Sequence, residues 1–222
     1  MAEKTEEDLL FKEIDEELRQ DQATKLWRAY GKHAIAAAIL LVVAVAGFQG
    51  WKAYDISTRE ADGKRFSKAQ AMVQTGQREA ALNAFADIAA DGRAGYVLLA
   101  RFQQARLLAG AGDAAGAAAA YRALSGEGGI DPLYRDLAVI LGGLQELNAA
   151  GADLAALESR LEPLIAETSP WRFSAREIKG LLARRSGDAA AARKLFQGLA
   201  TDPRAPQGVR ARAQEMLSIL GK

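Results

Sequence analysis

The chain has 222 residues and a formal net charge of +1, and half of its residues are apolar. This balanced charge argues against a nucleic-acid-binding protein. The absence of cysteine excludes disulfides, thiol catalysis and cysteine-ligated zinc. Alanine, leucine, arginine and glutamate are abundant and favour helix, and beyond residue 60 no segment alternates apolar with polar residues. We therefore predict an all-α fold.

The first 30 residues form an acidic tail. Residues 1–33 carry nine acidic and six basic side chains, whereas the rest of the chain is mildly basic. Leu10, Ile14 and Leu18 recur at every fourth position with charged residues between them, which predicts a short amphipathic helix. This segment either docks on a partner protein or is a solvated helix that keeps the tail soluble.

Residues 31–54 are predicted to form a transmembrane helix. The eighteen residues 34–51 carry no charge, and at helical rise they cover about 27 Å, close to the roughly 30 Å of a bilayer's hydrocarbon core. Aromatic rings and long basic side chains stand on both sides of this stretch, where they suit the headgroup regions. These flanking residues are Trp27, Tyr30, Lys32, Trp51, Lys52 and Tyr54.

Two other interpretations of this apolar stretch remain. A buried core helix is disfavoured because the stretch is apolar around its whole circumference, unlike every later helix. A cleaved signal peptide would suit the small residues Ala44-Val45-Ala46, but the thirty-three mostly acidic residues ahead of the stretch are unlike the short basic start of a signal. Four basic residues precede the stretch within twenty positions and five follow it, so charge leaves the orientation open.

A repeated pattern occupies residues 55–222. Gly76, Gly112 and Gly187 each begin a short turn, with thirty-six residues between the first two and seventy-five between the last two. An alanine follows each glycine by five residues and an aromatic residue by nine, and a weaker copy starts at Ala152-Asp153. This spacing predicts a second helix with one apolar face in each unit. The residues predicted to pack between helices are Ala81, Phe85, Ala117, Tyr121, Leu157, Leu161, Ala192 and Phe196.

The first helix of each unit also matches. Ala69, Ala105 and Gly180 precede the turns at equal distances and would let the second helix approach closely, whereas the third copy has Gln145 there. Asp113 would cap the helix after its turn because its carboxylate can accept hydrogen bonds from free N–H groups. Asp188 would do the same in the last copy. Asp-Pro or Ser-Pro pairs separate the units, and residues 209–220 are predicted to form a closing helix.

A repeat of this kind, near thirty-four residues long, resembles the tetratricopeptide repeat. The resemblance covers residues 60–220 and implies a right-handed α-solenoid of antiparallel helix pairs, ended by a capping helix. It also implies a concave wall that holds protein partners.

Residues suited to catalysis, cofactor binding or metal binding are not apparent. The single histidine, His33, has no neighbouring partner, and the glycine-rich stretches lack the lysine of a phosphate-binding loop. Glu158 and Glu162 lie one helical turn apart and are expected to be solvated. A basic strip, defined as Arg176, Lys179, Arg184 and Arg185, is either a solvated face or a contact for an acidic partner or lipid headgroups. We predict no enzyme, no cofactor and no metal.

The whole arrangement resembles the bacterial YfgM-like family. The resemblance is carried by the segment at 25–32 (Lys-Leu-Trp-Arg-Ala-Tyr-Gly-Lys), the apolar span, the segment at 50–54 (Gly-Trp-Lys-Ala-Tyr) and the repeats. It implies an ancillary subunit of the Sec translocon, with a cytoplasmic N-terminus, one helix in the inner membrane and a periplasmic repeat domain. The implied partners are the SecYEG channel, a membrane-anchored periplasmic chaperone and emerging polypeptides. A membrane-anchored scaffold for envelope assembly or cell division would share this architecture.

Overall fold

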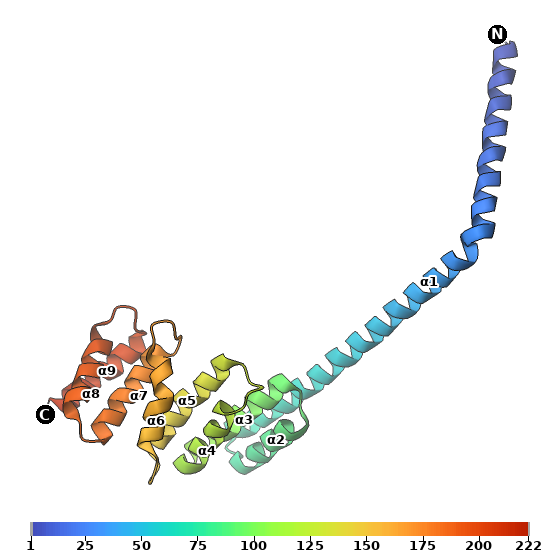
Figure 1. The fold of residues 1–222 in the computed structure, drawn as a ribbon. Coiled ribbons are helices and arrows are strands. Elements are labelled where there is room, and N and C mark those ends of the chain that lie inside the picture. The colour runs from blue at the N-terminus through green and yellow to red at the C-terminus, as the bar shows by residue number, and fades with distance from the viewer. Residues whose placement is uncertain (1, 222) are drawn as a thin grey trace. The chain divides into compact units, whose positions relative to one another are not determined.

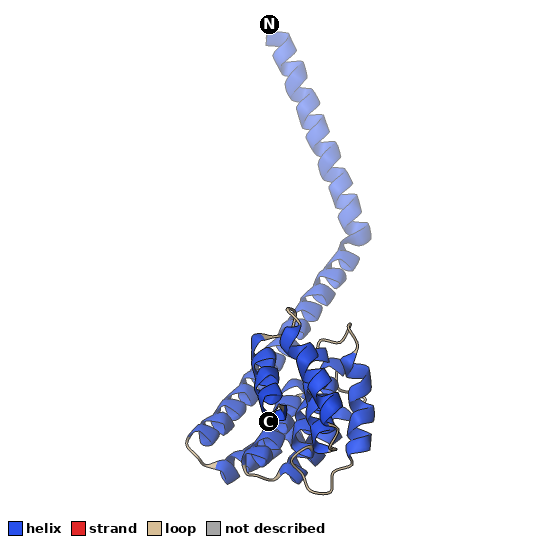
Figure 2. Cartoon of the chain, turned by 90° about the vertical axis from the view of Figure 1, so that its left-hand side faces the viewer, coloured by secondary structure: helices blue, strands red, loops and turns tan. Residues whose placement is uncertain are grey.

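The computed structural model describes residues 2–221, with side chains described for residues 24–33, 35–93 and 95–221. Residues 2–221 contain helices and no strand, which confirms the predicted all-α fold (Figure 1; Figure 2). In chain order the elements are α1 (Ala2–Gln74), α2 (Arg78–Asp91), α3 (Ala94–Gly110), α4 (Ala114–Ser125), α5 (Pro132–Glu146), α6 (Leu154–Leu161), the 3-10 helix η1 (Glu162–Ile165), α7 (Arg172–Arg185), α8 (Ala189–Thr201) and α9 (Gln207–Leu220).

Contacts divide the chain into two compact units, residues 1–60 and 61–222, and α1 contributes to both. The first unit holds one helix that is long and apolar enough to cross a membrane, with a mean hydropathy of 2.1 over a window that is not buried at all. The alternative of a buried core helix is therefore wrong for this structure. The side chains of the predicted amphipathic segment around Leu10, Ile14 and Leu18 lie outside the described residues. The predicted boundaries at residues 30 and 54 fall within the single helix α1.

Each helix pair of the second unit turns at a glycine with a left-handed backbone. The φ angles are +78° at Gly76, +84° at Gly112, +69° at Gly151 and +84° at Gly187. Only glycine adopts such angles without a steric penalty, which is why these glycines mark the turns. After three of the turns an aspartate caps the next helix, by accepting a hydrogen bond from the backbone N–H three residues later (2.8–3.0 Å). The predicted caps at Asp113 and Asp188 are thus confirmed.

The third pair departs from the predicted register. The turn between α5 and α6 runs over seven residues, 147–153, whereas the other pairs use three. Gly151, and not Ala152, supplies the left-handed turn. The longer turn moves the close approach of the two helices from Gln145 to Gly143, whose added methyl group would lie 3.0 Å from Leu157 Cδ1. The absence of a small residue at 145 is therefore compensated two positions earlier.

Proline explains the short second helix of this pair. α6 ends at Leu161, and Pro163 follows within the 3-10 helix η1. Proline has no N–H to donate to the preceding turn, and its ring clashes with the carbonyl four residues back, so the α-helix cannot continue through it. Leu164 in η1 is nevertheless 5% exposed and joins the core beside Leu157 and Leu161. The irregular segment thus completes the apolar face that α6 alone would leave short.

The core of the second unit consists of successive clusters, each shared by one helix pair and the first helix of the next pair. One cluster joins Phe85 of α2 to Ala100 of α3, and the next joins Tyr121 of α4 to Ala138 of α5. The later clusters join α5 and α6 to α7, and α7 and α8 to α9. No pair therefore buries its apolar face alone, which is the behaviour expected of a repeat array. The predicted closing helix corresponds to α9, which completes the last cluster with Val209 and Ala213.

Candidate functional site

The paired carboxylates Glu158 and Glu162 are exposed, as expected, and both lie near one lysine. Lys179 of α7 lies 2.6 Å from Glu162 Oε2 and 3.7 Å from Glu158 Oε1, so the lysine forms a close ion pair with Glu162 and a longer one with Glu158. Within the described side chains, no three histidine, aspartate or glutamate residues lie close enough to hold a metal ion. His33 is exposed on α1.

The eight residues predicted to pack between helices all lie in the core. Tyr121 is 4% exposed and the other seven are fully buried: Ala81, Phe85, Ala117, Leu157, Leu161, Ala192 and Phe196. Small residues on the facing helices make room for the aromatic rings, because an added methyl group at Gly180 would lie 2.8 Å from Phe196 Cζ. Phe66 of α1 lies 5.3 Å from Phe85 within the first pair, and a ring contact also crosses to the next pair, since Phe66 lies 5.9 Å from Tyr96 of α3 between centroids. Burial raises the pKa of Tyr121.

The residues predicted to flank a membrane span are solvent-exposed on α1. Trp27, Tyr30, Trp51 and Tyr54 are each about two-thirds exposed, and Lys32 and Lys52 are exposed as well. The large apolar side chains between them, from Ile35 to Phe48, are also more than half exposed. A run of exposed apolar side chains this long needs an apolar environment, because soluble monomers rarely expose such a surface.

A family comparison covers both parts of this architecture. The model of a family described as the tetratricopeptide repeat-like domain matches residues 24–217. The chain belongs to this family. No curated protein and no solved structure gives a significant match to the sequence of this chain. The tetratricopeptide repeat-like domain is a protein-interaction scaffold and typically not an enzyme; here the matched residues include the apolar part of α1 as well as every helix pair.

Within the tetratricopeptide repeat-like domain, half of the basic strip is neutralised. Lys179 pairs with Glu162, and Arg176 donates to Glu167 Oε1 at 2.7 Å and to the Ile165 carbonyl at 3.1 Å. These pairs connect α7 to the segment before it. The basic strip, expected to be a solvated face or a contact for an acidic partner, therefore divides in two: Arg176 and Lys179 have carboxylate partners on neighbouring elements, whereas Arg184 and Arg185 are exposed.

Arg185 acts as a cap for the end of α5. Its guanidinium donates to the carbonyls of Glu146 (2.8 Å), Ala149 (2.9 Å) and Leu147. The last carbonyls of a helix have no partner within the helix and carry a partial negative charge, so a cation placed there stabilises the end. This contact joins two pairs that lie nearly forty residues apart in the sequence. No local sequence signal indicates it, because the acceptors are backbone atoms.

Glu146 is a buried carboxylate that the sequence pattern does not reveal. It is 4% exposed, and its oxygens lie 2.7 Å from Arg160 of α6 and 3.5 Å from Arg122 of α4. A buried charge of this kind is tolerated only when it is paired and hydrogen-bonded. The two arginines come from the neighbouring second helices, so the pairing becomes visible only when the helices are placed side by side.

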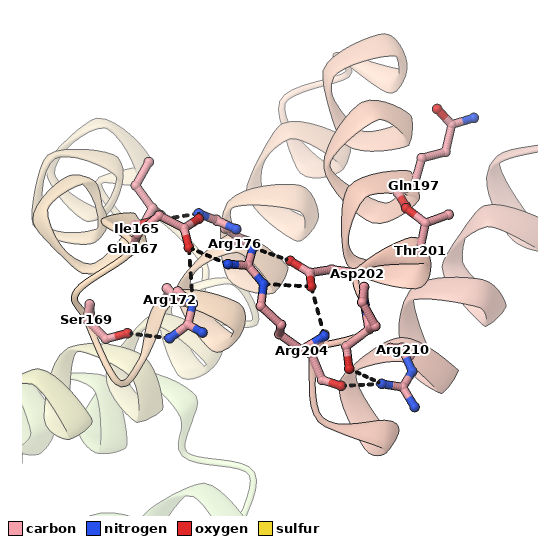
Figure 3. Close-up of polar contacts among 12 residues, drawn as sticks. Ile165, Glu167, Ser169, Arg172, Arg176, Gln197, Thr201, Asp202, Arg204 and Arg210 are labelled. Carbon is pink, nitrogen blue, oxygen red and sulfur yellow. Dashed lines mark hydrogen bonds and ion pairs between the residues drawn. The ribbon is translucent and has the colours of Figure 1, made fainter.

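A second polar network joins the loops at the C-terminal end of the domain (Figure 3). Glu167 lies 2.7 Å from Arg176 and 3.2 Å from Arg204, and these arginines lower the pKa of its carboxyl, with the Arg176 hydrogen bond as the largest cause. Asp202 accepts hydrogen bonds from the side chain and the backbone N–H of Arg204, which lower its pKa to about 2. The network connects the loop before α7 to the loop before α9.

Proposed function

We propose that this protein is a non-enzymatic ancillary subunit of the bacterial Sec translocon, similar to the YfgM-like family. In this proposal α1 crosses the inner membrane with the N-terminus in the cytoplasm, and the helix pairs form a right-handed solenoid in the periplasm. The domain links the SecYEG channel to a membrane-anchored chaperone while exported polypeptides emerge. The observation that carries the proposal is that one helix, α1, contains the exposed apolar stretch and also contributes Ala69 to the first repeat core.

The physical advantage of this arrangement is confinement. A repeat stack offers an extended wall for a protein segment, and each contact along such a wall can be weak. Holding the wall beside a channel raises the effective concentration of the two partners, so modest intrinsic affinity suffices for capture. In the proposal the first repeat follows the span directly along the chain, because α1 includes residues of both.

The span itself would contact the channel. Its small residues Ala36, Ala37, Ala38 and Gly47 would allow a partner helix to approach closely, and an added methyl group at Gly47 meets no atom of the chain within 4 Å. The flanking aromatic residues would fix the depth of the helix in the bilayer. Replacing Gly47 with leucine is expected to reduce co-purification with the channel, and Val43→Leu serves as a matched control in the same span.

Photo-crosslinking in living cells tests the proposal. A crosslinking amino acid at position 48, where Phe48 is 60% exposed, is expected to capture a channel subunit identifiable by mass spectrometry. Orientation is tested separately with single cysteines, since the natural chain has none. An impermeant maleimide added to intact cells is expected to label Lys194→Cys and leave Lys25→Cys unlabelled. Crosslinks to an envelope-assembly or cell-division protein in place of the channel would refute the translocon proposal.

A further inference from the structure

An open pocket lies between the ends of α5 and α7, the first helices of two successive pairs. Its volume is about 620 Å³, and its lining consists of Leu144, Leu147, Asn148, Leu181, Arg184 and Arg185. We call this site the α5–α7 pocket. Leu144 is 36% exposed there, although the neighbouring positions Gly143 and Glu146 of α5 are buried. Three leucines in one open pocket provide an apolar contact surface of the kind on which peptide anchors depend.

The charge of the α5–α7 pocket is unbalanced. None of its six lining residues is acidic, and two are arginines. Arg185 donates its N–H groups to backbone carbonyls at the end of α5, so its positive charge meets the helix-end dipole and, among the described side chains, no carboxylate. Arg184 donates from Nη1 to the Met216 sulfur at 3.9 Å. A sulfur is a weak acceptor and leaves the guanidinium able to bind a carboxylate.

Other cations of the same domain show that this imbalance is local. Arg176, Lys179 and Arg212 each lie within 2.7 Å of a carboxylate oxygen on another element of the domain. Two of these cations lie on α7 and one on α9, so carboxylate partners are present on both sides of the last helix pair. Arg184 and Arg185 differ from these cations because they border the α5–α7 pocket. The lining of this pocket contains no acidic residue that could pair with their positive charges.

We propose that the α5–α7 pocket binds an acidic segment of a partner protein that carries a large apolar side chain between its carboxylates. The apolar side chain would pack against Leu144 and Leu181, and a neighbouring carboxylate would accept two hydrogen bonds from Arg184. Two parallel hydrogen bonds from a guanidinium to a carboxylate are stronger than hydrogen bonds between uncharged groups. This inference rests on the proposed scaffold function and specifies which partner chemistry the scaffold takes at this position.

The binding test uses the full chain in non-ionic detergent micelles and measures fluorescence anisotropy. The probe is a labelled peptide with one leucine flanked by two glutamates on each side and capped at both ends. We expect saturable binding that weakens with added salt, because charge–charge attraction is screened. Replacing the glutamates with glutamines is expected to weaken binding about tenfold, because the charge-assisted contact is lost. Replacing the leucine with serine is expected to weaken binding by a similar factor, because the apolar contact is lost.

Variants of the protein locate the site. Arg184→Glu and Leu144→Asp are each expected to weaken peptide binding about tenfold. The matched controls Lys194→Glu on α8 and Leu99→Asp on α3 make the same changes at exposed positions outside the pocket, and they are expected to leave binding unchanged. Circular dichroism of every variant must show unaltered helix content. Undetectable binding, or equal weakening by the control variants, would overturn the inference.

Two further arms separate this site from other anion binders and from the proposed function. Phosphatidylglycerol vesicles or inorganic phosphate that displaced the peptide completely would show a general anion site and overturn the inference. In cells, Arg184→Glu is expected to leave the crosslink from position 48 to the channel intact. Peptide binding without a channel crosslink refutes the translocon proposal alone, whereas a channel crosslink without peptide binding refutes only the α5–α7 pocket.

Discussion

Replacing Phe196 with alanine tests whether the aromatic residue nine positions after the turn glycine holds the last repeats together. The ring is fully buried between α7 and α8 and belongs to the cluster that α9 completes. Its neighbours cannot fill the space that it would leave, because Gly180 has no side chain and Ala192 has only a methyl group. Burial of such a ring contributes about 1.5–3 kcal/mol, and the residual cavity adds to that. We therefore expect a loss of about 3–5 kcal/mol.

Urea unfolding of the full chain in detergent, followed by circular dichroism, measures this change. The loss would be a large fraction of the roughly 5–15 kcal/mol by which domains are stable. Because each helix pair contacts only its neighbours, amide exchange should accelerate in α7, α8 and α9 and change little in α2. Leu99→Ala, at a position that is 46% exposed, is the control and should cost less than about 1 kcal/mol. A loss below about 1 kcal/mol for Phe196→Ala, or uniform acceleration of exchange, would refute the packing argument.

Three further predictions concern single polar contacts. Arg185→Ala should cost about 1–3 kcal/mol, because it leaves carbonyls at the end of α5 without donors, and amide exchange around residues 147–153 should accelerate; Lys194→Ala, on the exposed face of α8, is the comparison. Asp188→Ala should cost about 1 kcal/mol through loss of the α8 cap, and Asp188→Asn should retain most of it in the same urea assay. The pKa of Asp202 is lower in the folded chain, about 2, than its ordinary 3.8, so its contribution to stability is present above pH 3.8 and is lost as the pH falls toward 2. Asp202→Asn should flatten the dependence of thermal unfolding on pH in that window, and an unchanged slope would contradict the role given to Arg204.

The helix pairs that share the glycine, alanine and aromatic spacing could be predicted from the sequence alone. Gly112 and Gly187 need a left-handed backbone, the aspartates after them cap the next helix, and the alanines and aromatic residues return on one face. These are properties of a residue and its near neighbours, so they are visible in the sequence. The third pair is harder to predict, because its longer turn changes which residue of α5 meets Leu157.

Contacts between pairs were not predictable in the same way. The basic residues of α7 occur as one strip in the sequence, yet Arg176 and Lys179 have carboxylate partners, Arg185 caps another helix and Arg184 borders the α5–α7 pocket. The buried Glu146 depends on arginines from two other helices. Each of these environments depends on atoms that are distant in sequence, and several of the acceptors are backbone carbonyls, which every residue has.

The amino-acid sequence by itself therefore determined the class of the fold, the turns and the inward-facing residues, because helical periodicity and backbone preference act over a few residues. It also determined that one stretch is too apolar for water, since no charge occurs across residues 34–51. Only the tertiary structure decided which cations are neutralised and which remain to meet a partner. Electrostatic pairing depends on the distance between side chains in space, and that distance is set by how one helix pair packs on the next.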